Sequence, residues 1–196
     1  MNIPSTPVKK YTKSKLKSVS KPSITRLKRD LKSLPISISN KLAWKPITIP
    51  PEFTLVIDTR EQQPMFRKPP KGLEIVDKKL DNGDYSVLGF EDKIFIERKK
   101  LSDLLSYIGR ERKVTVGKLT RIIDYEFKGL IIECDEASLF APQIYSKVTK
   151  EMVEGFLLSF EIRFGGHYKC SKYRSECERW ILNHAVYAYN RLRLVQ

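Results

Sequence analysis

The order of the predicted elements indicates an α/β protein with one mixed β-sheet flanked by α-helices. Short apolar or alternating segments dominate residues 53–97, and apolar residues at helical spacing dominate residues 101–127. Beyond these residues, single strands alternate with longer helical patterns. We therefore expect three or four strands, two helices, a strand, a helix, a strand and a closing helix.

The strands are predicted from β-branched or alternating runs that end at turn residues. Asp81-Asn82-Gly83 marks the turn after the second run, and the third and fourth runs form a hairpin across residues 89–92. Leu130 to Glu133 is apolar on both faces, which is typical of a buried parallel strand. The expected strands cover residues 53–58, 73–80, 85–88, 93–97, 130–133 and 167–170.

The helices are predicted from apolar residues at i, i+3, i+4 and i+7. The first helix is marked by Leu101, Leu104, Leu105 and Ile108, with Ser102 and Asp103 near its start. The second is marked by Val116, Leu119, Ile122, Ile123 and Phe127. The third is expected at residues 150–164 and the last at 173–193.

Positive charge is concentrated near the start of the chain. Residues 1–50 hold twelve Lys or Arg and one acid, against 25 basic and 22 acidic residues in the rest. We expect residues 1–50 to be a disordered Lys/Ser/Pro-rich arm and linker, and residues 51–196 to form one domain. Such an arm binds nucleic acid without sequence specificity; a solubilising or targeting extension is the alternative.

Composition also bounds the cellular setting. Three cysteines provide no framework of paired disulfides, which favours a reducing interior. No apolar run reaches the ~18 residues of a membrane helix, and no secretory signal is apparent. We expect an intracellular protein with no membrane partner, in the cytoplasm of a bacterium or virus-infected cell, or in a eukaryotic nucleus.

The segment Glu97-Arg98-Lys99 closes an apolar strand, so alternation places Glu97 and Lys99 on one face and Arg98 on the other. Asp84 follows Gly83 one strand earlier. Two carboxylates can hold a hard divalent cation, and an adjacent lysine can orient a water or stabilise charge on a phosphate. This set predicts phosphodiester hydrolysis, whereas the tripeptide alone is typical of a solvated strand end.

Three further acids occupy strand ends or helix starts, where α/β sheets collect their active groups. Asp58 and Glu61 follow the first strand, and Asp103 lies in the first turn of a helix. Asp58 and Glu61 are candidates to bind a second ion or to position water; their alternative role is that of solvated acids paired with Arg60. For Asp103 the alternative role is a favourable interaction with the helix dipole.

These motifs closely resemble those of the XPF-type nuclease domain family, a branch of the PD-(D/E)xK restriction-endonuclease-like nucleases. The matching segments are Asp58-x-Arg60-Glu61, Gly83-Asp84-Tyr85 and Glu97-Arg98-Lys99-x-x-x-Asp103-Leu104. The resemblance covers about residues 53–193 and is strongest to small stand-alone bacterial and phage members. It implies a restriction-endonuclease-like fold and a catalytic set of Asp58, Glu61, Asp84, Glu97, Arg98, Lys99 and Asp103.

The resemblance also implies cofactor and substrate. Asp84, Glu97 and Asp58 are the expected ligands of Mg²⁺, for which Mn²⁺ would substitute, and the backbone carbonyl of Arg98 is a further candidate ligand. Arg110, Arg112 and Lys113 are expected to contact the DNA backbone, since Arg binds phosphate in a bidentate manner. The expected activity is structure-specific cleavage of branched or flapped DNA during repair or recombination.

Two alternatives remain open from the sequence. A catalytically silent DNA-binding scaffold of the same fold is the first, although such members typically lose the acidic and Glu-Arg-Lys residues that this chain keeps. A general basic nucleic-acid-binding protein is the second. XPF-type domains commonly pair, so we expect a homodimer through apolar residues of the closing helix: Trp180, Ile181, Tyr187 and Leu194.

The chain also contains His167, Cys170, Cys177 and His184 within one stretch. Their spacing fits no zinc-finger pattern. Cys177 and His184 would lie about 10 Å apart along a helix, so a shared zinc is not favoured over buried core residues.

Overall fold

The structure is a computed structural model that describes residues 48–144 and 146–194. All of these residues belong to the unit Pro46–Gln196. The predicted basic arm, residues 1–50, lies almost entirely outside the described residues, and it stays a prediction.

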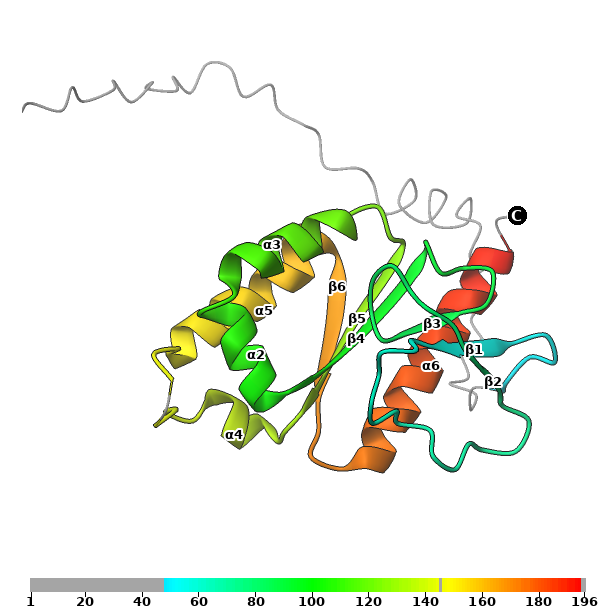
Figure 1. Cartoon of the computed structure of the whole chain (residues 1–196), viewed down its shortest axis with the longest axis horizontal. Helices are drawn as coiled ribbons and strands as arrows, with labels where there is room; N and C mark the ends of the chain where they lie inside the picture. The colour runs from blue at the N-terminus through cyan, green and yellow to red at the C-terminus, as the bar shows by residue number, and fades with distance from the viewer. Residues whose placement is uncertain (1–47, 145, 195–196) are drawn as a thin grey trace, which may run out of the picture. The chain divides into compact units, whose positions relative to one another are not determined.

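Six strands form one mixed sheet in the order β2-β1-β3-β4-β5-β6 (Figure 1). β1 is parallel to β2, β3 is antiparallel to both β1 and β4, and β5 is parallel to both β4 and β6. This arrangement confirms the predicted mixed α/β sheet. The strands are β1 (Thr54–Ile57), β2 (Glu74–Asp77), β3 (Tyr85–Val87), β4 (Ile94–Lys100), β5 (Phe127–Glu133) and β6 (Gly166–Cys170).

The helices cover both faces of the sheet, with α6 on one face and α2, α3 and α5 on the other (Figure 1). The predictions of residues 101–108 and 150–164 match α2 and α5 at both ends. The helices are α2 (Leu101–Ile108), α3 (Arg112–Arg121), α4 (Glu136–Phe140), α5 (Lys150–Phe164) and α6 (Arg174–Arg193).

The predicted second helix was wrong at its C-terminal end. α3 ends at Arg121, and Phe127 opens β5 instead of closing a helix. Val116 and Ile123 are exposed, so the apolar spacing that suggested one long helix did not mark a continuous core face. α4 was not predicted; Asp135 caps it by accepting a 2.8 Å hydrogen bond from the backbone N–H of Ser138.

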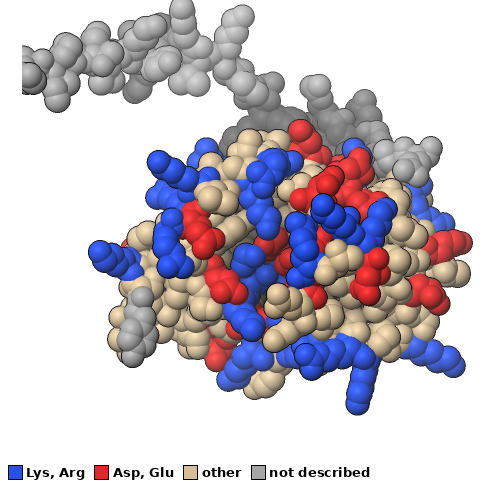
Figure 2. Space-filling model, viewed as in Figure 1, with Lys and Arg blue, Asp and Glu red and all other residues tan. Residues whose placement is uncertain are grey.

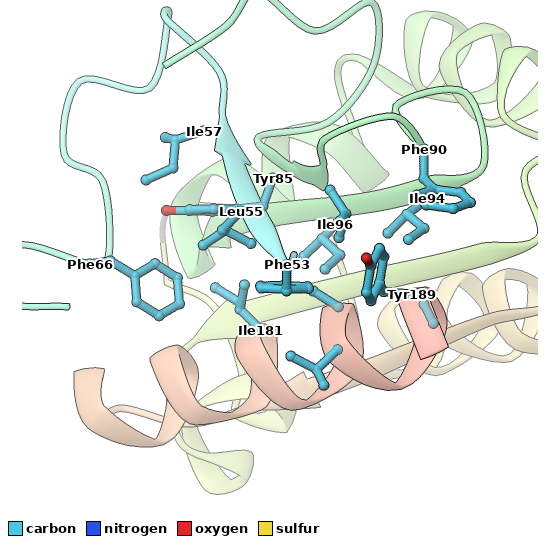
Figure 3. Close-up of a cluster of buried hydrophobic side chains, with 14 of the residues drawn as sticks. Phe53, Leu55, Ile57, Phe66, Tyr85, Phe90, Ile94, Ile96, Ile181 and Tyr189 are labelled. Atoms are coloured by element: carbon cyan, nitrogen blue, oxygen red, sulfur yellow. The ribbon is translucent and has the colours of Figure 1, made fainter. Parts of the chain in front are cut away.

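Side chains of β4 alternate between two hydrophobic cores. Ile94 and Ile96 pack on the α6 side, whereas Phe95 packs against α2, α3 and α5. On the α6 side, the Phe53 ring meets the Tyr189 ring edge-on at 5.5 Å between centroids (Figure 3). β4 is therefore anchored between both layers, and its polar residues 97–100 extend from a rigid central strand.

Candidate active site

The end of β4 presents its charged side chains to opposite faces, as alternation predicts. Lys99 lies on the α2 side, with its Nζ 5.2 Å from the centroid of the Tyr107 ring. Glu97 is directed to the same face and contacts Lys118 of α3. Arg98 points to the other face, toward Glu133 at the end of β5.

Asp84 is placed beside this strand by the turn that precedes β3. Gly83 has a φ of +86°, and a Cβ there would come within 3.0 Å of both the Ile96 carbonyl and the Phe95 ring, so only glycine fits. The backbone N–H of Asp84 donates to the Ile96 carbonyl at 2.8 Å. In return, the backbone N–H of Arg98 donates to Oδ2 of Asp84 at 2.7 Å.

The two carboxylates are close enough to influence each other. Burial, and then the charge of Glu97, raise the pKa of Asp84 from its ordinary 3.8 to about 7. Glu97 is only 2% exposed, and its charge is balanced by ammonium groups. The structure thus brings together Asp84, Glu97 and Lys99, the central set predicted from the sequence.

Lys118 is a member of this cluster that sequence reasoning missed. Its Nζ lies 2.7 Å from Oε1 and 2.8 Å from Oε2 of Glu97, although the two residues are 21 positions apart. Lys118 and Arg121 are three residues apart on α3, which places them on one helix face. That spacing indicates a basic helix face, but only the tertiary packing of α3 against α2 directs Lys118 at Glu97.

Arg98 forms a separate ionic cluster on the α6 side of the sheet. Its guanidinium lies 2.6 Å from Glu133 and 3.1 Å from Glu61, and the Arg98 side chain is 8% exposed. The coulombic attraction of the two carboxylates raises the pKa of Arg98 despite the opposing effect of burial. Glu61 therefore contacts Arg98, and the pair joins the loop after β1 to the ends of β4 and β5.

Asp58 is almost fully buried and already has four donors. Oδ1 accepts from the backbone N–H and Nε of Arg60, and Oδ2 accepts from another Arg60 nitrogen and from the backbone N–H of Leu80. The hydrogen bonds from Arg60 lower the pKa of Asp58 to about 2. In this arrangement Asp58 orients Arg60 and binds the backbone after β2; its role as a metal ligand stays a prediction.

The remaining predicted residues are exposed and lie outside the cluster. Asp103, in the first turn of α2, accepts from the Ser102 hydroxyl at 3.3 Å. Arg110 donates to Ser106 at 2.8 Å. Arg112 and Lys113 open α3 on its exposed side. DNA contact by these three basic residues stays a prediction.

A pocket of about 510 Å³ opens beside the cluster. Figure 2 shows basic and acidic side chains gathered across the middle of this face. They lie between the helices α2 and α3 on one side and the strands β1 to β3 on the other. Its cations are Arg60, Arg98, Lys100, Lys118 and Arg121, and its other lining residues are Asp58, Glu61, Gln62, Gln63, Asp81, Asn82, Gly83 and Asp84. The pocket therefore combines acids with cations suited to a phosphate.

The donors present fit a hard divalent cation through two carboxylates. Oδ1 of Asp84 receives no hydrogen bond from the described residues, and Asp84 lines the pocket. Within residues 48–144 and 146–194, no group of three or more His, Cys, Asp or Glu side chains forms a metal cluster. Of the cysteines in the stretch from His167 to His184, Cys177 is a buried free cysteine and Cys170 a partly buried one.

The structure is an α/β domain whose pocket gathers acidic and basic side chains, and the comparisons identify its family. The model of the ERCC4 domain matches residues 57–184. The chain therefore belongs to the ERCC4-domain family of XPF-type nucleases, which confirms the predicted family. No curated protein sequence matches the chain.

Two solved structures are similar in fold. XPF from Aeropyrum pernix superposes with a TM-score of 0.55 and 20% sequence identity, covering 72% of this chain and 68% of that one. XPF from the same organism in complex with DNA superposes with a TM-score of 0.52 and 19% identity, covering 70% and 66%. At this identity the likeness establishes the restriction-endonuclease-like fold predicted from the motifs.

The predicted surface for a homodimer is only partly available. Ile181 is fully buried in the core below the sheet, because α6 turns that side chain inward. Trp180 packs over Gly129, where an added Cβ would come within 2.9 Å of its ring. Tyr187 and Leu194 are exposed. No helix among the described residues has both the length and the apolar composition needed to span a membrane.

Proposed function

We propose that this chain is a Mg²⁺-dependent endodeoxyribonuclease that hydrolyses phosphodiester bonds in branched or flapped DNA during repair or recombination. One observation carries the proposal: Asp84, Glu97 and Lys99 converge beside a pocket whose other cations suit a phosphate backbone. Membership of the ERCC4-domain family supports the same reaction class.

Asp84 and Glu97 would hold the divalent cation. Asp84 offers its free Oδ1, and its orientation is fixed from the backbone of Arg98. The carbonyl of Arg98 is a third candidate, because the N–H and C=O of one strand residue point to the same edge. When bound, Mg²⁺ supplies positive charge to the phosphate oxygens and lowers the pKa of a water molecule.

The other residues position the substrate and its charge. Lys99, held between Glu97 and the Tyr107 ring, is placed to orient the attacking water or to stabilise the phosphate in the transition state. Arg60 and Arg121 extend into the pocket with Lys100, and each can bind a neighbouring phosphate. Asp103, Arg110, Arg112 and Lys113 remain proposed contributors outside the pocket.

A cleavage assay on flap, splayed-arm, Holliday and linear DNA tests the proposal, with Mg²⁺, with Mn²⁺ and with chelator. Wild-type protein should cut branched DNA when a divalent cation is present. Glu97→Gln and Lys99→Ala should each lose at least ~10²-fold in rate while retaining their fold by circular dichroism. Lys150→Met, which removes an exposed Lys150–Glu154 pair on α5, is the matched control.

Two results would redirect the proposal. DNA binding without cleavage of any substrate would favour the catalytically silent scaffold. Equal cleavage by wild-type protein and Glu97→Gln would place the active site elsewhere.

A further inference from the structure

The two lysines that neutralise Glu97 do not share the carboxylate equally. Lys118 holds both oxygens, with Nζ 2.7 Å from Oε1 and 2.8 Å from Oε2. Lys99 contacts Oε1 alone. Because of Lys118, neither oxygen of the proposed metal ligand is free of an ammonium group.

Lys118 is also the lysine better placed to move. Lys118 comes from α3 and lines the 510 Å³ pocket. Lys99 projects from the central strand β4, and among the described residues it does not line that pocket. The Lys118 side chain is 25% exposed, against 18% for Lys99. The Nζ of Lys99 lies 5.2 Å from the centroid of the Tyr107 ring, whereas the Nζ of Lys118 lies 6.0 Å from it. The four-carbon side chain of Lys118 is flexible enough to change direction by rotation about its four single bonds.

We infer that Lys118 is a positioning residue that holds Glu97 as an internal counter-ion, yields the carboxylate to a divalent cation, and then turns its ammonium toward DNA phosphate in the pocket. This inference rests on the proposed function, because it deepens the role of the same site. Arg121, three residues further along α3, lines the same pocket. The Lys118 ammonium would turn toward the same part of the pocket as the Arg121 guanidinium. Lys118 therefore couples occupancy of the metal ligand to the charge offered to the substrate.

Loss of the Lys118 charge should change metal binding and cleavage in opposite directions, which loss of a purely structural lysine would not do. Lys118 competes with a divalent cation for Glu97 and repels it, so removal of its charge should strengthen metal binding. The same removal deprives the pocket of a cation, so cleavage should slow. If Lys118 only supported the fold, its loss would weaken both properties together.

Mn²⁺ binding to the full chain, measured by calorimetry without DNA, tests the first effect. Lys118→Gln, which keeps a hydrogen-bond donor but loses the charge, should bind Mn²⁺ about tenfold more tightly than wild type. Lys118→Arg keeps the charge and can hold both oxygens, so it should bind no more tightly than wild type. Lys150→Met should match wild type, and loss of binding in Asp84→Asn identifies the site.

Flap cleavage in Mg²⁺ tests the second effect. Lys118→Gln should lose about tenfold in kcat/KM, while Lys118→Arg should retain most of it. Unchanged or weaker Mn²⁺ binding by Lys118→Gln would overturn the inference, as would failure of wild-type protein to bind Mn²⁺ through Asp84. Should no DNA be cut, the proposed function fails and so does the substrate-facing half of the inference, but the order of Mn²⁺ affinities still decides whether Lys118 competes with the cation for Glu97. Thermal melting of each variant identifies any that does not fold, and Lys118→Met then replaces Lys118→Gln.

Discussion

The backbone N–H of Arg98 donates a 2.7 Å hydrogen bond to the side chain of Asp84, across 14 residues of sequence. The orientation of the Asp84 carboxylate therefore depends on the β4 backbone and not on any side chain at position 98. This bond links the Gly83-Asp84-Tyr85 and Glu97-Arg98-Lys99 segments directly. Consequently, substitution of the Arg98 side chain can disturb stability without removing the support of Asp84.

Asp84→Asn should be more stable than wild type above neutral pH. The pKa of Asp84 is raised from 3.8 to about 7, so the folded chain retains a proton that the unfolded chain loses between about pH 4 and 7. The contribution of Asp84 to the free energy of unfolding therefore falls as pH rises through that window. In urea denaturation, Asp84→Asn should have a higher free energy of unfolding than wild type at pH 8 and an equal one near pH 4. A less stable Asn variant at pH 8 would contradict the raised pKa.

Asp58→Asn should be destabilised by about 2 kcal/mol at pH 7, because the pKa of Asp58 is lowered to about 2 by Arg60. A depressed pKa contributes stability above the unfolded value of 3.8, and that contribution is lost as pH falls toward 2. The difference between variant and wild type should therefore shrink between about pH 4 and pH 2 in urea denaturation. A constant difference would mean that packing, and not charge, is the cause.

Arg98→Gln should lower the free energy of unfolding by roughly 3 kcal/mol, because it leaves Glu61 and Glu133 without their shared cation. The double variant Arg98→Gln/Glu133→Gln should lose less than the sum of the single losses, since the uncompensated charge is gone. Chemical denaturation of the four proteins gives the coupling. Additive losses would show that the pair does not interact.

Deletion of residues 1–45 should weaken DNA binding to all substrates and reduce its salt dependence. If about half of the cations of the arm touch phosphates, the log–log slope should fall by about 5, at ~0.9 per contact. The order of cleavage rates among DNA structures should survive, because lysines that bind phosphates without contacting bases respond to charge and not to shape. A truncated protein that cuts flaps and linear duplex equally would assign the selectivity to the arm.

Sedimentation at micromolar concentration should detect a homodimer, and Tyr187→Ser should weaken it, since Tyr187 is exposed on α6. Ile181 is unsuitable for this test, because its substitution would open the core. A single 22.8 kDa species for the wild-type protein would reject the homodimer.

Local sequence determined those features that depend on periodicity and on residue type. The spacing of Leu101, Leu104, Leu105 and Ile108 located α2, because one face of a short helix must be apolar to be buried. Alternation placed Glu97 and Lys99 on the face opposite Arg98, because a strand has a period of two. Gly83 marked the turn before Asp84, since only glycine fits there without a clash.

Tertiary structure decided which distant charges meet. Nothing in the spacing of Lys118 and Glu97 predicts their contact; it exists because α3 packs against α2 and brings Lys118 within reach of Glu97 on β4. In the same way, β4 and β5 lie parallel, with Lys100 opposite Glu133. This register brings the Glu133 carboxylate next to the Arg98 guanidinium. Sequence identifies the residue types that a phosphodiester site needs. The arrangement of helices and strands decides which of these residues form ion pairs, because ion pairs form between neighbours in space.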